Sequence, residues 1–234
     1  MSNHIISVTL QQEKFPTGDH YPFNLPIFNQ TKKMVFDTSI TLFVGENGTG
    51  KSTMLEALAR ASDIHIWSKP EGVRYRVNRY EKQLYKYLSL EWSNDRVPGA
   101  YFGSEIFKDF KNILDEWATS DPGQLKYFGG DSLVTQSHGQ SMMSYFHARY
   151  QIKGLYFMDE PETALSPRSQ LELLDILGEN GQAGHAQFIL ATHSPILLAC
   201  PGAKIYSFDR VPVSVVKYEE TEHYQLYKRF LLER

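Results

Sequence analysis

The sequence predicts an α/β fold built on a mostly parallel sheet, and three observations lead to this prediction. Apolar runs at residues 40–44, 155–158 and 187–191 have the length of buried strands. Apolar residues at helical spacing follow the first two runs, at residues 53–60 and 171–177. A glycine-rich turn joins the first run to its helix. Strands that alternate with helices are typical of parallel sheets, because the helix returns the chain to the edge where the next strand begins.

The length and composition favour one globular domain over residues 1–234. The chain is 41% hydrophobic, which is enough for one core, and its formal net charge of −3 does not indicate non-specific nucleic-acid binding. The single cysteine, Cys200, excludes an internal disulfide and is typical of a reducing compartment. No apolar run is long enough to span a bilayer, and the N-terminus lacks the pattern of a secretory signal. We therefore expect a soluble, cytoplasmic protein without a membrane segment.

The first part of the chain predicts an antiparallel β subdomain. Ile6, Val8 and Leu10 alternate with polar residues, as in a half-buried strand. Residues 11–33 contain several prolines and predict a long loop. Residues 73–92 are rich in Tyr, Val and Leu at alternating positions, which predicts a pair of antiparallel strands.

The middle of the chain predicts a small helical lobe, at about residues 104–150, inserted into the α/β core. Residues 105–118 have the spacing of an amphipathic helix, and residues 123–139 form an irregular connector with several glycines and serines. After this lobe, Ser166 and Pro167 fit an N-cap followed by proline at the first helical position.

The glycine-rich turn after residues 40–44 fits the phosphate-binding pattern G-x-x-x-x-G-K-[ST] without a mismatch. Glycines let successive backbone N–H groups turn toward phosphate oxygens, and the helix that follows adds its positive N-terminal end. Lys51 would neutralise the β- and γ-phosphates of a nucleotide, and the Ser52 hydroxyl would be a ligand of Mg²⁺. The predicted nucleotide-binding residues are Gly45, Glu46, Asn47, Gly48, Thr49, Gly50, Lys51, Ser52 and Thr53.

Two acidic residues follow the apolar run 155–158. Asp159 at a strand end suits a carboxylate that holds Mg²⁺, which retains part of its hydration shell in proteins. Glu160 is then placed to orient or deprotonate an attacking water. A strand that merely leads into a proline turn is the alternative, and the presence of a phosphate loop favours the catalytic interpretation.

His193 closes the apolar run 187–191. A histidine beside a core strand is often structural, but this strand is expected to neighbour the one that ends at Asp159. The carboxyl ends of such strands meet where phosphates bind. We therefore interpret His193 as a sensor of the γ-phosphate.

The phosphate loop, Asp159-Glu160-Pro161 and His193 together resemble the ABC-type ATPases, a group of P-loop NTPases. This resemblance implies ATP and Mg²⁺ as cofactors, with Lys51, Glu160 and His193 as catalytic residues and with Ser52 and Asp159 as metal ligands. His193 matches the switch histidine of the family.

Residues 136–140 look like a divergent form of the Leu-Ser-Gly-Gly-Gln signature of that family. Ser137, Gly139 and Gln140 match, whereas Gln136 and His138 differ. In the family this motif contacts ATP bound to the other subunit, so the resemblance implies an ATP-dependent homodimer. A plain helix cap at Ser137 is the alternative.

Two further family positions match less well. Glu105 follows the strand-like residues 100–102 and is the candidate for the metal-binding Q-loop position, where the family has glutamine. A glutamate at the start of a helix explains Glu105 equally well. Residues 162–166 correspond to the D-loop, with Ser166 where transport ATPases have aspartate.

The segments Glu-Pro-Glu-Thr-Ala-Leu-Ser-Pro and Ala-Thr-His-Ser-Pro-Ile-Leu resemble the small stand-alone AAA-type ABC-like ATPases near the RecF and SMC heads. The resemblance implies an ATP-hydrolysing, ATP-dependent dimerising switch with an unknown protein partner, and it leaves a role in DNA maintenance or defence open. The alternatives are the ATP-binding subunit of an ABC transporter and a nucleotide-dependent interaction module with little turnover.

Three other features are weaker candidates. The histidines and Cys200 show no spacing typical of a transition-metal site. Phe15, Tyr21 and Phe23 could stack on adenine, but they are expected rather to anchor the proline-rich loop. The basic residues between Lys69 and Lys86 could form a nucleic-acid face, but a solvated sheet face is the preferred interpretation.

Overall fold

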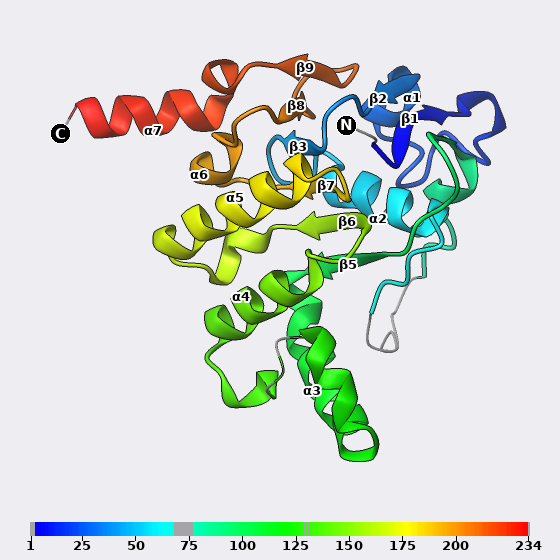
Figure 1. Ribbon diagram of the computed structural model, residues 1–234. Coiled ribbons are helices and arrows are strands. Elements are labelled where there is room, and N and C mark those ends of the chain that lie inside the picture. The colour runs from blue at the N-terminus through cyan, green and yellow to red at the C-terminus, as the bar shows by residue number, and fades with distance from the viewer. Residues whose placement is uncertain (1–2, 68–76, 129, 131, 234) are drawn as a thin grey trace.

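The computed structural model describes residues 3–67, 77–128, 130 and 132–233. A six-stranded sheet lies at the centre, with a three-stranded sheet on one side and helices on the other (Figure 1). The strands are β1 (Ile5–Leu10), β2 (Lys33–Val35), β3 (Ile40–Val44), β4 (Leu88–Trp92), β5 (Gly99–Gly103), β6 (Gly154–Asp159), β7 (Ala186–Ala191), β8 (Lys204–Ser207) and β9 (Ser214–Val216). The helices are α1 (Pro26–Gln30), α2 (Lys51–Ala61), α3 (Ser104–Ser120), α4 (His138–Arg149), α5 (Pro167–Gln182), α6 (Pro195–Leu198) and α7 (Glu222–Leu232).

The central sheet has the strand order β5-β6-β7-β3-β8-β9. All neighbouring pairs in it are parallel except β8 and β9, which are antiparallel. The predicted strands at 40–44, 155–158 and 187–191 are β3, β6 and β7, and the predicted α/β fold is confirmed. Since β7 lies between β3 and β6, the three strand ends that carry the predicted site are adjacent.

Both faces of the central sheet are buried, which explains the nearly continuous apolar runs of its strands. Phe157 and Ile189 pack on one face in a core shared with α2, whereas Tyr156 and Leu190 pack on the other with α5. Along each strand, successive side chains point to opposite faces. The helix α2 thus lies between the two sheets and is fixed on both sides.

The three-stranded sheet has the order β2-β1-β4 and is antiparallel throughout, as the predicted β subdomain requires. Of the strand pair predicted within 73–92, the second strand overlaps β4, whereas the first falls mostly on residues outside the described part of the chain. Residues 68–76 lie outside the described part of the chain, and among residues 77–92 only β4 is a strand, whose partner is β1. The partner comes from the start of the chain, which alternation of residue types within one segment cannot reveal.

Two further predictions, for the loop at residues 11–33 and for the alternation in the first strand, differ from the structure. Residues 11–33 are not only loop, because they contain a short 3-10 helix at Gln12–Lys14 and the helix α1, which has Pro26 in its first turn. Within β1 the buried side chains include Ile5, Ser7 and Val8, whereas Ile6 is exposed. A register shift between Ile5 and Ser7 interrupts the expected alternation.

Residues 104–150 contain α3 and α4, joined by two 3-10 helices at Pro122–Phe128 and Leu133–Thr135. The expected amphipathic helix at 105–118 is confirmed as α3. Figure 1 shows this segment extending away from the central sheet. The segment leaves β5 and returns to β6, which are neighbours in the sheet, so its insertion does not disturb the strand order.

Candidate functional site

The phosphate loop joins β3 to α2 and depends on its glycines. Gly45, Gly48 and Gly50 have φ angles of +152°, +80° and +101°. A Cβ atom on Gly50 would lie 2.9 Å from the Phe28 ring, and one on Gly45 would lie 3.0 Å from Asp209 Oδ1. The left-handed backbone and these close approaches both exclude a side chain. The loop therefore keeps its backbone free to wrap around an anion.

Lys51 is the first residue of α2 and is buried, with 4% of its surface exposed. Its ammonium donates to the carbonyl oxygens of Gly45 at 2.6 Å and Glu46 at 3.0 Å, so the charge lies inside the loop. Burial lowers the pKa of Lys51, while the carboxylates of Glu160, Asp209, Asp159 and Glu46 act to raise it. A phosphate anion in this loop would compensate a cation that has lost its water.

The remaining residues of the phosphate loop lie around the buried Lys51 ammonium. Glu46 and Asn47 are exposed, and the hydroxyl of Thr49 donates to the carbonyl of Glu46 at 2.8 Å. Thr53, in the first turn of α2, is hydrogen-bonded through its hydroxyl to the hydroxyl of Tyr21. Tyr21 is partly exposed beside the site, so it differs from the core residue Phe23.

Asp159 ends β6 and is held by two hydroxyl groups. Ser52 donates to Asp159 Oδ1 at 2.9 Å, and Tyr101 donates to Asp159 Oδ2 at 3.2 Å. The structure thus brings together two of the three predicted metal ligands, Ser52 from α2 and Asp159 from β6. Burial raises the pKa of Asp159 to about 6, although the Ser52 hydrogen bond opposes this, because a carboxylate loses solvation there.

This pKa gives a prediction for the nucleotide-free protein. The folded-state pKa of about 6 exceeds the usual value of 3.8, so burial of this group costs stability once the pH rises through that interval. Asp159→Asn should raise the free energy of unfolding by about 2 kcal/mol at pH 8. The gain should disappear near pH 4. Urea unfolding at both pH values tests this, and an equal gain at both would contradict it.

Glu160 follows Asp159 with a left-handed backbone, φ +45°, which is uncommon for a residue other than glycine. Its N–H donates to the carbonyl of Ala191 at 2.9 Å, which ties the end of β6 to the end of β7. Glu160 Oε1 lies 3.5 Å from Nε2 of His193. The structure therefore places two of the three predicted catalytic side chains, Glu160 and His193, at one position on the sheet edge.

His193 is held from two further directions. Its backbone N–H donates to Glu162 Oε1 at 2.6 Å, and its ring Nδ1 lies 3.1 Å from Nε2 of His223. Burial lowers the pKa of His193 and raises that of Glu162. The ring is thus fixed against the strand end with its Nε2 toward Glu160.

The signature-like residues lie at the start of α4. Ser137 is the N-cap and accepts from the N–H of Gln140 at 3.4 Å, while Gln140 Oε1 accepts from the N–H of Ser137 at 3.2 Å. A Cβ on Gly139 would lie 3.0 Å from the carbonyl of Ala164, in the 3-10 helix that follows Glu160. The motif is therefore a capped helix start that packs against the segment after Glu160.

The structure does not place every predicted site residue. Glu105 lies in the first turn of α3, but its side chain is outside the described part of the structure. Of the basic residues between Lys69 and Lys86, those up to Arg76 are also outside it. Arg79, Lys82 and Lys86 lie in turns and a 3-10 helix, so these three residues are not on a sheet face.

Three functional candidates were not evident from the sequence. Asp209 follows β8 and its Oδ1 accepts the N–H of Glu46 at 2.7 Å, which orients the phosphate loop. Tyr101 on β5 reaches Asp159, and His223 on α7 reaches His193. An acidic residue directly after the apolar run at 205–208 could have indicated Asp209, but no local pattern indicates the other two.

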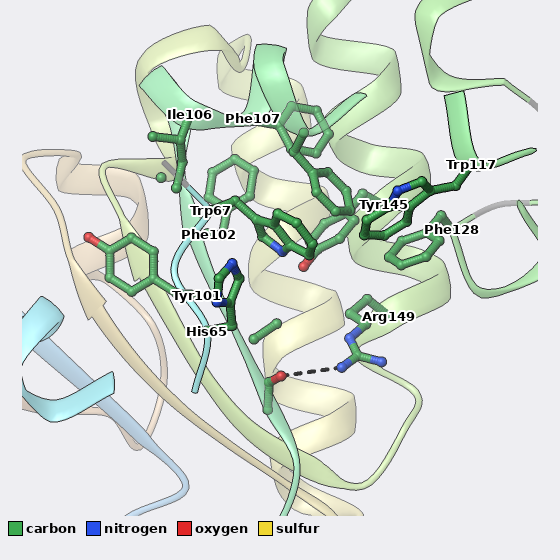
Figure 2. Close-up of a pocket in the computed structure, with 14 residues that line it drawn as sticks. His65, Trp67, Tyr101, Phe102, Ile106, Phe107, Trp117, Phe128, Tyr145 and Arg149 are labelled. Carbon is green, nitrogen blue, oxygen red and sulfur yellow. Dashed lines mark hydrogen bonds between the residues drawn. The ribbon is translucent and has the colours of Figure 1, made fainter. Parts of the chain in front are cut away.

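Two cavities flank this site and differ in character. One, of about 340 Å³, is lined by polar and charged side chains that include Ser52, Asp159 and Glu160. The other, of about 260 Å³, lies between β5 and the helical segment and is lined mostly by aromatic rings (Figure 2). Arg149 borders this aromatic pocket and donates to the carbonyl of Gly99 at 3.3 Å. Of these two cavities, the polar one contains carboxylates and a hydroxyl suited to Mg²⁺ and phosphate.

Comparisons with known proteins agree with this site. A family model described as "AAA domain, putative AbiEii toxin, Type IV TA system" matches residues 143–199, and one described as "AAA domain" matches residues 24–63. The first stretch contains Asp159, Glu160 and His193, and the second contains the phosphate loop.

Curated relatives match most of the chain. It is 26% identical over 175 residues to the "Probable siderophore transport system ATP-binding protein YusV" of Bacillus subtilis, covering 69% of this chain and 63% of that protein. It is 25% identical over 196 residues to the "Ferric enterobactin transport ATP-binding protein FepC" of Escherichia coli, covering 76% and 68%. The chain thus spans under two thirds of the length of the first relative.

Solved structures show the same fold. CbiO1 from Clostridium perfringens, part of the ABC transporter complex CbiONQ, has a TM-score of 0.55 at 17% identity, covering 98% of this chain and 96% of that chain. The structure described as "An inward-facing conformation of a putative metal-chelate type ABC transporter" has a TM-score of 0.54 at 16% identity, covering 95% of this chain and 88% of that chain.

The fold, the phosphate loop and the strand-end carboxylates define a P-loop NTPase. Within that class, the chain is similar to transport ATP-binding proteins and matches AAA-type family models over residues 24–63 and 143–199. The resemblance seen in the sequence is confirmed. In the described residues no helix has the length and apolarity to cross a membrane.

Proposed function

We propose that this chain binds ATP with Mg²⁺, hydrolyses it, and uses it as a switch for head-to-tail dimerisation. The observation that carries the proposal is the convergence of three adjacent strand ends. The strand β3 leads to Lys51, β6 leads to Asp159 and Glu160, and β7 leads to His193. Ligands of open α/β sheets bind at this edge.

The residues present fit Mg²⁺ as well as ATP. Ser52 and Asp159 provide hard oxygen ligands 2.9 Å apart, in the polar cavity beside the phosphate loop. Among the described residues no cluster of three or more His, Cys, Asp or Glu side chains could hold a metal alone. This suits Mg²⁺, which in proteins takes one or two side chains and completes its shell with water and phosphate.

Each residue then has a definable role. The loop N–H groups and Lys51 bind the phosphates, and Ser52 and Asp159 hold Mg²⁺, which when bound neutralises phosphate charge. Glu160 orients the attacking water and accepts its proton. His193 donates from Nε2 to the γ-phosphate.

The signature residues contribute to the second active site of the dimer. Ser137 and Gly139 at the start of α4 would meet ATP held by a second copy, using the positive end of the helix and the serine hydroxyl. We propose that residues 104–150 act as the lobe that presents them. Hydrolysis would remove the γ-phosphate and reopen the dimer, so that ATP controls contact with a partner protein.

Ser137→Arg tests the signature assignment. The arginine should spare ATP binding, with affinity within about threefold of wild type, but block ATP-dependent dimerisation, because its bulk would occupy the place of the partner's phosphates. The loss of the cap should cost about 1 kcal/mol of stability. Ser132→Arg is the control, because Ser132 also caps a helix of this lobe. Light scattering that shows a normal dimer for Ser137→Arg would contradict the assignment.

The function itself is tested by phosphate release from ATP by the purified protein with Mg²⁺. We expect turnover that needs the metal, and ATP binding without any hydrolysis would instead indicate an interaction module. A transporter subunit is the second candidate, because the relatives named above are transport ATP-binding proteins. Co-purification with a membrane protein from the native cell would support a transporter subunit. A role in DNA maintenance or defence would instead show as turnover stimulated by DNA or by a soluble partner.

A further inference from the structure

The proposed reaction assigns no role to His223. It is the second residue of α7, and its Nε2 lies 3.1 Å from Nδ1 of His193. The helix α7 lies next to the C-terminus of the chain and extends away from the sheet (Figure 1). Its start is fixed by Thr221, which is buried and whose hydroxyl accepts the N–H of Tyr224 at 3.2 Å. The contact between the two rings is therefore built into the fold.

The distance between the rings means that a single proton lies between the two nitrogens. Either His223 donates to a bare Nδ1 of His193, or His193 donates to a bare Nε2 of His223. In the first case a neutral His193 carries its proton on Nε2. In the second case its Nε2 is bare and can only accept. The choice decides whether His193 can donate to a phosphate.

Neighbouring groups select the first arrangement. Glu160 Oε1 lies 3.5 Å from His193 Nε2, and a carboxylate attracts an N–H but repels a lone pair. The Nδ1 of His223 is buried without a hydrogen-bond partner in the described structure, as is Nε2 of His193. Either arrangement leaves one N–H and one bare nitrogen of the pair without a partner, so the carboxylate of Glu160 decides between them.

The charged and titratable groups around the pair agree with this arrangement. Glu162 accepts the backbone N–H of His193, and Glu160 faces its ring from the end of β6. Lys51 lies on the phosphate-loop side and, together with burial, opposes a second proton on His193. Glu46 acts from the same loop in the opposite direction. These surroundings favour the neutral ring of His193, and the Glu160 carboxylate favours the proton on its Nε2.

We propose that His223 is a positioning residue that holds His193 in the tautomer with the proton on Nε2, ready to donate to the γ-phosphate. This inference rests on the proposed function and adds a residue to it. The neighbour of a functional histidine commonly sets its tautomer and orientation. Here that neighbour belongs to α7, so the first turn of α7 becomes part of the active site. Displacement of α7 would then lower turnover without touching the nucleotide.

The direct test is nitrogen NMR of the full chain labelled with ¹⁵N-histidine, without nucleotide. Chemical shifts distinguish protonated from bare ring nitrogens, and the signals of His193 are assigned by their loss in His193→Gln. We expect a bare Nδ1 and a protonated Nε2 in the wild type. A protonated Nδ1 in the neutral wild-type ring would overturn the inference, whatever the turnover of the enzyme.

Two variants of His223 test the consequence. His223→Leu removes the donor and should reduce kcat for ATP about 10-fold, with KM within about twofold, the scale seen for outer partners of functional histidines. His223→Gln keeps an N–H donor near the position of Nε2 and should restore at least about half of wild-type kcat and the same tautomer. Equal kcat in wild type and His223→Leu would contradict the inference, as would failure of a folded His223→Gln to exceed His223→Leu.

The matched control is Gln225→Leu. Gln225 lies in the same turn of α7 and donates to the carbonyl of Glu219 at 2.6 Å, so this variant measures the effect of disturbing the helix start alone. We expect wild-type kcat for it. A 10-fold loss in this variant too would mean a structural role for the turn and refute the specific role of His223. An inactive wild-type protein would refute the proposed function instead and leave the NMR result as the test of the tautomer.

Discussion

Lys51→Ala is expected to weaken ATP binding by at least about 100-fold. The ammonium is the buried cation of the phosphate loop, and truncation of one partner of a buried charge pair costs several kcal/mol. The variant also leaves the carbonyls of Gly45 and Glu46 without the hydrogen bonds that Lys51 donates. Isothermal titration of the protein with ATP and Mg²⁺ measures the change in affinity.

Lys33→Ala is the control for that measurement. Lys33 lies on β2 and forms an exposed ion pair with Glu91 at 3.4 Å. Such pairs contribute little, so ATP affinity and melting temperature should stay as in the wild type. A folded Lys51→Ala protein that binds ATP within about threefold of wild type would show that this loop does not bind the phosphates.

Glu160→Gln is expected to reduce kcat for ATP about 1,000-fold while leaving ATP affinity within about threefold. The amide has the shape of the carboxylate but cannot accept a proton from water, and general-base catalysis commonly contributes 10²–10⁴-fold. The hydrogen bond between the N–H of residue 160 and Ala191 does not involve the side chain, so the strand end should stay intact. Phosphate release under single-turnover conditions measures the loss.

Glu56→Gln serves as the comparison for this variant. Glu56 lines the same polar cavity from α2, where it pairs with Arg60 at 3.7 Å. Its carboxylate is not placed at the strand ends, so kcat should change by less than about threefold. If Glu56→Gln lost as much activity as Glu160→Gln, the base would have to be reassigned.

Local sequence patterns were sufficient for the elements that form the site. The strands β3, β6 and β7 are buried on both faces, so their apolar runs were evident, and the glycine pattern is demanded by the loop backbone. The N-caps Ser137 and Ser166 were predictable because capping depends on neighbouring residues alone. These features depend on interactions within a few residues.

Features that depend on distant segments were not predictable in this way. The partner of β4 is β1, and no alternation within 73–92 could reveal it. Tyr101 reaches Asp159 across 58 residues of sequence, and His223 reaches His193 across 30. The fold decides these contacts by bringing strand edges and the last helix to one place. They matter most for the chemistry, because they orient the carboxylate and the histidine.

If ATP joins two copies of this chain, light scattering after gel filtration of Glu160→Gln should detect the dimer. With ATP and Mg²⁺ the protein should elute at twice the mass of the 26.9 kDa chain, and without nucleotide at that mass. The slow hydrolysis of this variant keeps the ATP-bound state populated during the run. A protein that binds ATP under these conditions and remains at the mass of one chain would refute ATP-dependent dimerisation.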